Sequence, residues 1–220
     1  MTPDFVEQLV HEVRTPLNTI MGWVMLMKKQ QPDPARLAEG LAVIERSARA
    51  QARLLTDFAD LNALRRGTLC LVPAQVDIAE VLKTAVSTAL PDTAARDCLD
   101  LELHDAPLIV QGDRERLVQV VGIMLQLSAR GAPPDGRIHI SAARPGRGGH
   151  AGVRIEIAMR TSWPGLAASE LGDTRLRSGS SLDFALARLL AASHGGELLA
   201  TQAGAGGGLA LTLTLHAPTA

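Results

Sequence analysis

The chain has 220 residues and a formal net charge of −1 at pH 7, from 22 Lys and Arg against 23 Asp and Glu. With 46% apolar and 20% charged residues, its composition is that of a folded globular protein and excludes a disordered or collagen-like chain. The near-zero charge disfavours nucleic acid and anionic membranes as partners, and an aromatic content of 2% excludes a base-stacking surface.

The first predicted element is a long helix over residues 4 to 30. Its apolar side chains recur in steps of three and four and so share one stripe: Phe5, Leu9, Val13, Leu17, Ile20, Val24 and Met27. Asp33 and Pro34 suit the cap and first turn of a second helix, which runs to about Arg66. The short connection predicts an antiparallel hairpin. Because two helices alone cannot enclose a core, we expect a dimer that forms a four-helix bundle.

After Gly67 the pattern changes to short strands mixed with helices. We expect strands near 99–103, 137–142, 153–158 and 209–215, and helices near 77–90, 113–130 and 182–193. The glycine-rich stretches 144–152 and 203–208 indicate hairpin loops between strands. The sequence therefore predicts an α+β protein with a helical domain over 1–66 and a mixed domain over 67–220.

The cysteines and histidines give no metal-binding pattern. Cys70 and Cys98 match neither a disulfide framework nor a zinc spacing, so we expect free thiols in a reducing compartment. His194, before two glycines, indicates a helix end. The remaining four histidines outside the first helix lack ligand partners at suitable spacing. No apolar run reaches the roughly 18 residues of a membrane span, and the N-terminus lacks a secretory signal, so we expect a cytoplasmic protein without membrane contact.

His11 falls on the side of the first helix opposite its apolar stripe, about 160° away at 100° per residue. Thr15 and Asn18 share this outer face, and Glu12 is adjacent in sequence. An exposed imidazole beside a carboxylate and a hydroxyl is a candidate nucleophile site, and a surface histidine without a role is the alternative. Pro16 costs a helix interior about 3 kcal/mol, which favours a functional reason for this segment.

Residues 11–18, HEVRTPLN, resemble the phosphoacceptor box of sensor histidine kinases, and the hairpin around them resembles the dimerisation and histidine phosphotransfer domain of that family. The resemblance implies that His11 is the phosphorylated residue and that Glu12 orients or deprotonates its ring. It also implies that Thr15 positions water when a partner is dephosphorylated. The implied supporting residues are Arg14, Pro16 and Asn18. A homodimer and a bacterial cytoplasmic location follow from the same resemblance.

Residues 67–220 resemble the ATP-binding domain of this family, an α/β sandwich of the GHKL ATPase type, but their chemistry boxes depart from its pattern. Ile123 and Leu127 stand where the family has two asparagines, the second of them a Mg²⁺ ligand, and leucine cannot ligate a metal. Met159 replaces an aspartate that accepts a hydrogen bond from adenine. Trp163 replaces a glycine that lets the backbone approach the nucleotide.

The second glycine box departs as well, since GSSLDFA over 179–185 keeps only Gly179 of three glycines. We expect Ser181 to cap the helix that begins here. Asp183 would then place a negative charge in the first turn, where it competes with a phosphate. Arg130 corresponds to a position where the family often has a phosphate-facing lysine, but one cation does not replace a metal and two glycine turns. We therefore expect that this chain binds no ATP, metal or other cofactor.

An intact phosphoacceptor box beside a degenerate nucleotide site predicts a phosphorelay protein. His11 would exchange a phosphoryl group with the aspartate of a response-regulator receiver domain, which would bring its own Mg²⁺. Three alternatives remain: a phosphatase that acts through Thr15, a non-catalytic partner of another histidine kinase, and a divergent active kinase. The expected partners are thus a receiver domain, a second copy of the chain and, in the second alternative, another kinase.

Overall fold

The chain was described with a computed structural model that covers all residues except 1–2, 30–32, 91–96, 104–106, 131–132, 134, 145–153, 162–178, 204–207 and 217–220. Within its helices and strands, the side chains of 3–9, 11, 154–158, 179–181 and 203 also lie outside the description. The contacts of the chain divide it into two units, and along the sequence the boundary falls between Gly67 and Thr68. Of the described helices, none is both long and apolar enough to span a membrane.

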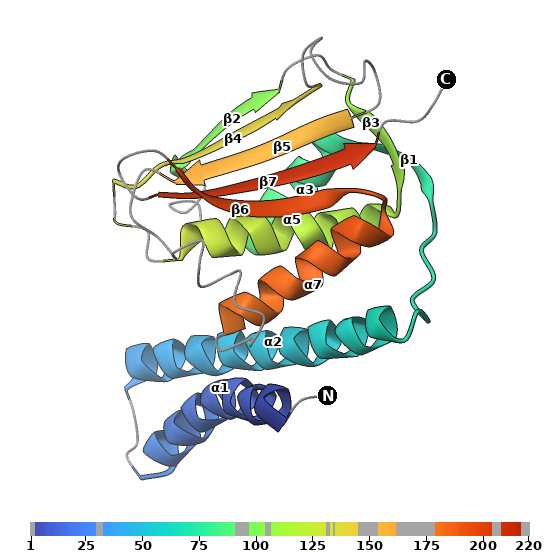
Figure 1. The fold of residues 1–220 in the computed structure, drawn as a ribbon. Coiled ribbons are helices and arrows are strands. Elements are labelled where there is room, and N and C mark those ends of the chain that lie inside the picture. Colours follow the sequence, from blue (N-terminus) through green and yellow to red (C-terminus); the bar gives the residue numbers. More distant parts are fainter. Residues whose placement is uncertain are drawn as a thin grey trace. The chain divides into compact units, whose positions relative to one another are not determined.

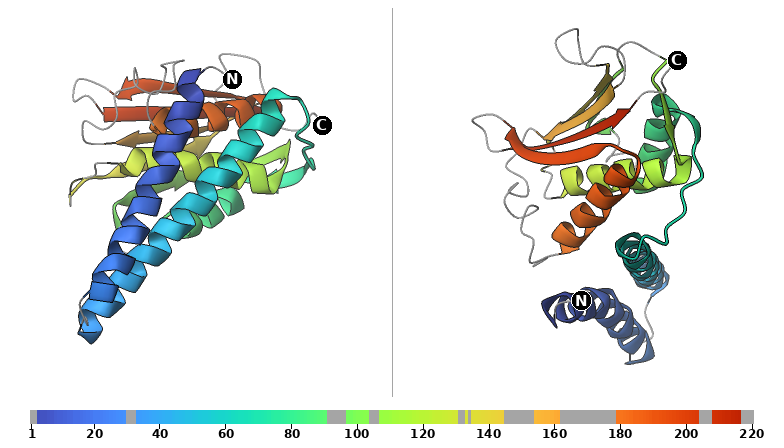
Figure 2. Two further views of the ribbon diagram at one scale, coloured as in Figure 1. Left: turned by 90° about the horizontal axis from the view of Figure 1, so that it is seen from below. Right: turned by 45° about the vertical axis from the view of Figure 1, so that its right-hand side comes forward.

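The first unit is a hairpin of two long antiparallel helices, α1 (Pro3–Lys29) and α2 (Pro34–Arg65), which lie side by side in Figures 1 and 2. The Asp33 side chain accepts a hydrogen bond from the backbone N of Arg36 at 2.9 Å and so caps α2. Five of the half-buried residues of α1 recur every three or four positions: Val13, Pro16, Ile20, Trp23 and Met27. They form its face toward α2. The predicted hairpin and its cap are confirmed.

Gly40 of α2 provides the space that this packing needs. It is buried, and a Cβ placed on it would lie 2.7 Å from Cε3 of Trp23 and would overlap Cε of Met27. Glycine in a helix interior costs about 0.5–1 kcal/mol relative to alanine. The close approach of the Trp23 ring explains why glycine is present at this position despite that cost.

The second unit is an α/β sandwich with its helices on one face of a mixed sheet (Figure 1). The helices are α3 (Ile78–Ala89), α5 (Arg114–Ala129) and α7 (Gly179–Ser193). The sheet has the order β2 (Leu99–Leu103), β4 (Ile138–Ala143), β5 (Arg154–Thr161), β7 (Gly208–His216) and β6 (Glu197–Ala203). The β2 and β4 strands pair in parallel, and the other neighbours pair antiparallel. A separate antiparallel pair joins β1 (Ala74–Asp77) to β3 (Ile109–Gly112).

The core of this unit lies between the sheet and the helices and consists of aliphatic side chains and methionine. Its fully buried members include Ile78, Leu82, Leu117, Met124, Leu125 and Ile140. The predicted helices and strands are confirmed, within a few residues at their ends. The predicted loops 144–152 and 203–208 lie largely outside the described residues, but each joins two strands that pair antiparallel. The sequence pattern missed β1 and β3, which have four residues each, and β6, where adjacent Leu198 and Leu199 break the alternation.

Asp113 connects the start of α5 to the segment that precedes β1. Its Oδ1 accepts hydrogen bonds from the backbone N of Glu115 and Arg116, at 3.0 and 3.2 Å, and so caps α5. Its Oδ2 accepts a hydrogen bond from the backbone N of Val72 at 3.0 Å. Burial raises the pKa of the Asp113 carboxyl, but these three donors and the Arg116 charge outweigh it. They hold the pKa below its ordinary value of 3.8.

His194 extends this connection to the end of α7. The backbone N of Asp113 donates to His194 Nε2 at 3.1 Å, so the ring proton is on Nδ1, which donates to the carbonyl of Leu190 at 2.7 Å. The helix ends at Ser193, and Gly195 follows with a φ of 69°. The prediction that His194 marks a helix end before a glycine turn is confirmed.

We expect Gly40→Ala to lower the melting temperature, although alanine is the better helix former, because the new Cβ would press on the Trp23 ring. Gly22→Ala is the matched control: a Cβ there meets no described atom within 4 Å, so it should stabilise by about 0.5–1 kcal/mol. Gly40→Val should cost about 1–3 kcal/mol. Thermal denaturation followed by circular dichroism measures all three. Equal stabilisation by both alanine variants would contradict this account of the packing.

We expect Asp113→Ala to lower the free energy of unfolding by about 1 kcal/mol through loss of the α5 cap. Because the folded-state pKa of Asp113 is lowered, its ionised form stabilises the fold above about pH 4, and this contribution is lost as the pH falls through the folded-state pKa. The difference between the wild type and Asp113→Asn in urea denaturation should therefore be largest near neutral pH and shrink as the pH falls through the lowered folded-state pKa. A difference independent of pH would show that the charge of Asp113 has no part in its stabilising role.

Candidate functional site

The predicted phosphoacceptor box lies in the first half of α1, and the helix continues through Pro16 to Lys29. Proline has no N–H to donate to the carbonyl four residues earlier, here that of Glu12. Pro16 and Glu12 are half-buried, and Pro16 belongs to the face of α1 that packs on α2. The proline therefore removes a backbone hydrogen bond one residue after His11, without ending the helix.

The described polar residues of the box other than Glu12 are exposed. Arg14, Thr15 and Asn18 are open to solvent, and the Thr15 carbonyl accepts a hydrogen bond from Thr19 Oγ1 at 3.2 Å. His11 lies in α1, one helical turn before Thr15, and its side chain is outside the description. The predicted orientation of the His11 ring toward solvent stays a prediction. Arg14, Thr15 and Asn18 thus form an exposed polar surface on α1.

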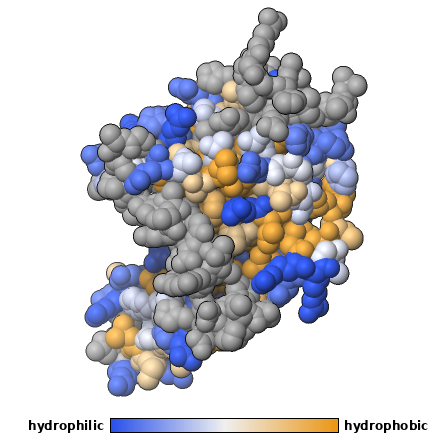
Figure 3. Space-filling model, in the orientation of Figure 1, coloured by the Kyte–Doolittle hydropathy of each residue, from blue (hydrophilic) through white to orange (hydrophobic). Residues whose placement is uncertain are grey.

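A second face of the hairpin carries exposed apolar residues. They are Val10, Leu17, Met21, Val24 and Met25 on α1, and Leu37, Leu41 and Leu55 on α2, with exposed fractions from 36% to 57%. Figure 3 shows apolar patches between the hydrophilic ones in the lower part of the view, where the hairpin lies. Single exposed apolar side chains are common, but a row at helical spacing marks a surface for another apolar partner. We call this set the apolar stripe.

Three positions of the predicted nucleotide site are part of the core of the second unit. Ile123 and Leu127 on α5 are 7% and 1% exposed, and Met159 on β5 is fully buried between Ile140 and Leu211 of the neighbouring strands. Mg²⁺ prefers oxygen ligands, and a thioether is a weak hydrogen-bond acceptor. The side chains at these positions therefore do not fit a magnesium nucleotide.

The start of α7 differs from its prediction. The helix begins at Gly179, so Ser181 is its third residue and Asp183 its fifth. The expectations that Ser181 caps the helix and that Asp183 lies in the first turn are both wrong, because residues 179–182 are themselves helical. The side chain of Ser181 and the whole of Trp163 lie outside the described residues.

Asp183 has a partner that the sequence analysis did not find. Arg130, the residue that ends α5, donates from Nη2 to Asp183 Oδ2 at 2.9 Å. The side chain of Asp183 is 15% exposed and that of Arg130 is 44% exposed. The sequence did offer one signal for this ion pair. Arg130 and Asp183 carry opposite charges at two positions that the resemblance assigns to phosphate contacts.

Among the described residues, no group of three or more His, Cys, Asp or Glu side chains is arranged to hold a metal ion. His139 Nδ1 lies 3.2 Å from Asp100 Oδ2 across β4 and β2, which is a pair rather than a ligand set. Cys70 is exposed, Cys98 is half-buried, and they form no disulfide.

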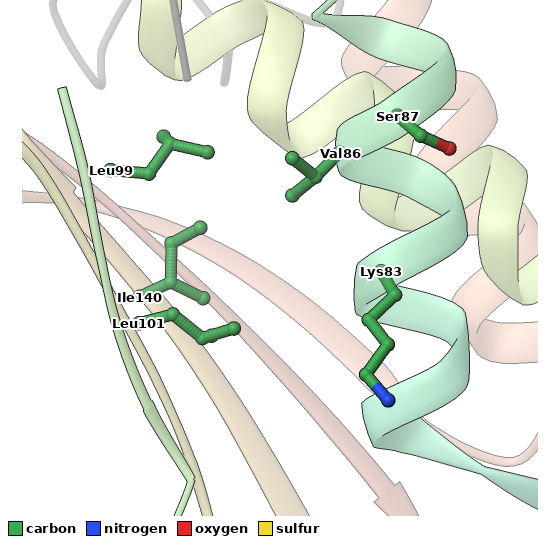
Figure 4. A pocket seen from close by; sticks show the side chains of 6 residues that line it. All are labelled: Lys83, Val86, Ser87, Leu99, Leu101 and Ile140. Carbon is green, nitrogen blue, oxygen red and sulfur yellow. The ribbon is translucent and has the colours of Figure 1, made fainter. Parts of the chain in front are cut away.

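A pocket of about 340 Å³ lies between α3 and the strands β2 and β4 (Figure 4), and none of the predicted site residues lines it. Its lining residues are Lys83, Val86, Ser87, Leu99, Leu101 and Ile140. Both polar ones already have partners within α3: Lys83 Nζ contacts Glu80 Oε1 at 2.8 Å, and Ser87 Oγ donates to the Thr84 carbonyl at 2.8 Å. Ligand sites combine apolar walls with convergent polar groups. We assign this pocket no ligand.

Comparison with known proteins bears on both units. Residues 4–67 match the His Kinase A (phospho-acceptor) domain family. Sensor protein DivL of Caulobacter vibrioides is 28% identical over 221 residues, which cover 98% of this chain and 28% of DivL. The histidine-protein kinase BaeS of Escherichia coli is 26% identical over 99% of this chain and 47% of BaeS. The chain thus spans between a quarter and a half of the length of these relatives.

Solved structures show the same fold. Histidine kinase AdeS of Acinetobacter baumannii covers 95% of this chain and 98% of its own, with a TM-score of 0.69 and 18% identity. Histidine kinase ThkA, solved in complex with response regulator protein TrrA, has a TM-score of 0.68 and 18% identity over 98% of this chain and 62% of its own. Residues 4–67 thus form a phospho-acceptor domain of the His Kinase A family, and the chain as a whole is similar to sensor histidine kinases.

Proposed function

We propose that this chain is a histidine phosphotransfer protein, in which His11 accepts a phosphoryl group from a response-regulator receiver aspartate and passes it to another. The contrast between the two sites supports this function. The box on α1 is complete, with Thr15 and Asn18 exposed, whereas Leu127 and Met159 are buried where a nucleotide would need polar contacts. The domain boundary proposed from the sequence, between residues 66 and 67, separates the two sites.

The transfer step requires little from the protein beyond position and charge. A nitrogen of the His11 imidazole would attack phosphorus in line with the leaving oxygen. The P–N bond forms as the P–O bond to the receiver aspartate breaks, and the aspartate leaves as a carboxylate. Glu12 would hold the other ring nitrogen and favour the attacking tautomer. The reverse transfer, from phosphohistidine to a second aspartate, uses the same groups.

A receiver domain is the partner that this chemistry needs. The related fold of ThkA was solved with a response regulator, which supports a similar partner here. Receiver domains would supply the Mg²⁺ for the reaction, so the chain itself needs neither metal nor nucleotide. Because such partners act inside the cell, we propose a cytoplasmic site of action.

A second copy of the chain is the occupant that we propose for the apolar stripe. The stripe runs along both helices, from Val10 to Met25 on α1 and from Leu37 to Leu55 on α2. Each hairpin lacks a second apolar layer, and pairing two hairpins through their stripes would provide it for both. The product is a four-helix bundle with Thr15 and Asn18 of the phosphoacceptor box on its outside.

Dephosphorylation of the receiver is the second candidate function, favoured by the exposure of Thr15. A hydroxyl on the surface of α1 can orient a water molecule toward a phosphoaspartate held beside His11. This activity needs Thr15 but no phosphohistidine, so it can be separated from transfer by mutation.

We expect His11→Ala to abolish acid-labile phosphate on the chain after incubation with a phosphorylated receiver domain, because the nucleophile is removed. His139→Ala, an exposed histidine on β4, is the matched control and should be labelled like the wild type. Thr15→Ala should still be labelled but should dephosphorylate the receiver at least tenfold more slowly if the second function is present. Labelling of His11→Ala at the wild-type level would refute the proposed function.

We also expect no label above the level of His11→Ala when the wild type is incubated with γ-labelled ATP and Mg²⁺. Buried Leu127 and Met159 give no oxygen ligand and no strong acceptor, so the nucleotide has no site. A related active kinase treated in parallel provides the positive control. His11-dependent label would instead favour a divergent active kinase.

A further inference from the structure

We propose that the Asp183 carboxylate serves as an internal anion. It pairs with the guanidinium of Arg130 near the start of α7 and prevents an external phosphate from binding to that guanidinium. This inference rests on the proposed loss of nucleotide binding and names the interaction that maintains it.

The ion pair joins the end of one helix to the beginning of another. Arg130 terminates α5 with an extended backbone, at φ −64° and ψ 126°, and Asp183 is the fifth residue of α7. Their Nη2 and Oδ2 atoms are 2.9 Å apart, and 53 residues separate them along the chain. The pair therefore links two helix ends that no backbone hydrogen bond connects among the described residues.

Asp183 is held in place by its own helix. Its neighbours Leu182 and Phe184 are each only 3% exposed, so the backbone at this point is anchored in the core. The carboxylate itself is largely shielded, since 15% of the side chain is exposed. A shielded carboxylate is costly unless a cation and hydrogen bonds accompany it. Arg130 is thus retained beside Asp183 and is not available to a ligand from solution.

Phosphate and carboxylate compete for the same features of a site. Both accept paired hydrogen bonds from a guanidinium. Asp183 is covalently part of the site and needs no encounter with Arg130, so it acts at a high effective concentration. An incoming phosphate must displace this carboxylate and approach its negative charge. The same pair of residues therefore stabilises the fold and repels an anion.

Removal of the Asp183 charge should uncover an anion site made by Arg130 and the start of α7. The test uses the full chain as wild type, Arg130→Gln, Asp183→Asn and the double variant, titrated with metal-free inorganic pyrophosphate in a calorimeter. We expect Asp183→Asn to bind at least tenfold more tightly than the wild type, and this gain to disappear in the double variant. Arg137→Gln removes another exposed arginine and should leave the weak wild-type binding unchanged.

The same four proteins give a second measurement through their folding equilibria. We expect Arg130→Gln to reduce the folding equilibrium constant at least threefold more in the wild type than in the Asp183→Asn background, because only in the wild type does the substitution take the guanidinium away from a shielded carboxylate. If Asp183→Asn does not fold, Asp183→Ser removes the same charge. Absence of the gained pyrophosphate binding by itself overturns the inference.

Failure of this inference is distinguishable from failure of the proposed function. Binding of magnesium ATP by the wild type, measured in the same calorimeter, would refute both the loss of nucleotide binding and the internal anion. If the wild type binds neither ATP nor pyrophosphate, and the Asp183→Asn variant gains no pyrophosphate binding, the internal anion alone is refuted.

Discussion

The burial of α5 is the constraint on which the second unit depends. Apolar side chains on several sides of this helix enter the core, and each fully buried one contributes about 1.5–3 kcal/mol. Its two ends are polar and each is tied to another element, by Asp113 at the start and by Arg130 at the finish. Ile123 and Leu127 thus belong to the packing of the unit.

The periodic parts of the chain could be predicted from the sequence. The spacing of Val13, Ile20 and Met27 indicates a helix face because helical geometry repeats every 3.6 residues, and the structure buries that face partly against α2. Leu17 and Val24 belonged to the same predicted stripe but are exposed, because only the partner helix decides which part of a wide stripe is covered. The local sequence pattern predicts the helix, whereas tertiary contacts decide which of its apolar side chains are buried.

Pairings between distant residues could not be predicted in this way. The contacts of Asp113 with Val72 and His194 span 41 and 81 residues, and that of Arg130 with Asp183 spans 53. Each depends on where helices end in space, and the start of α7 was misplaced by three residues from the sequence alone. The roles of His11, Glu12 and Thr15 were inferred from a resemblance carried by eight consecutive residues, which is local information.

The hydrogen bond between Val72 and Asp113 limits how far the two units can separate. Only residues 68–71 lie between the hairpin, which ends at Gly67, and this anchor point. Fully extended, the stretch from Gly67 to Val72 reaches at most about 18 Å. Because this connecting segment is short, bringing the two units together costs little conformational entropy. The bond at Val72 therefore sets the length of the chain segment that connects the two units.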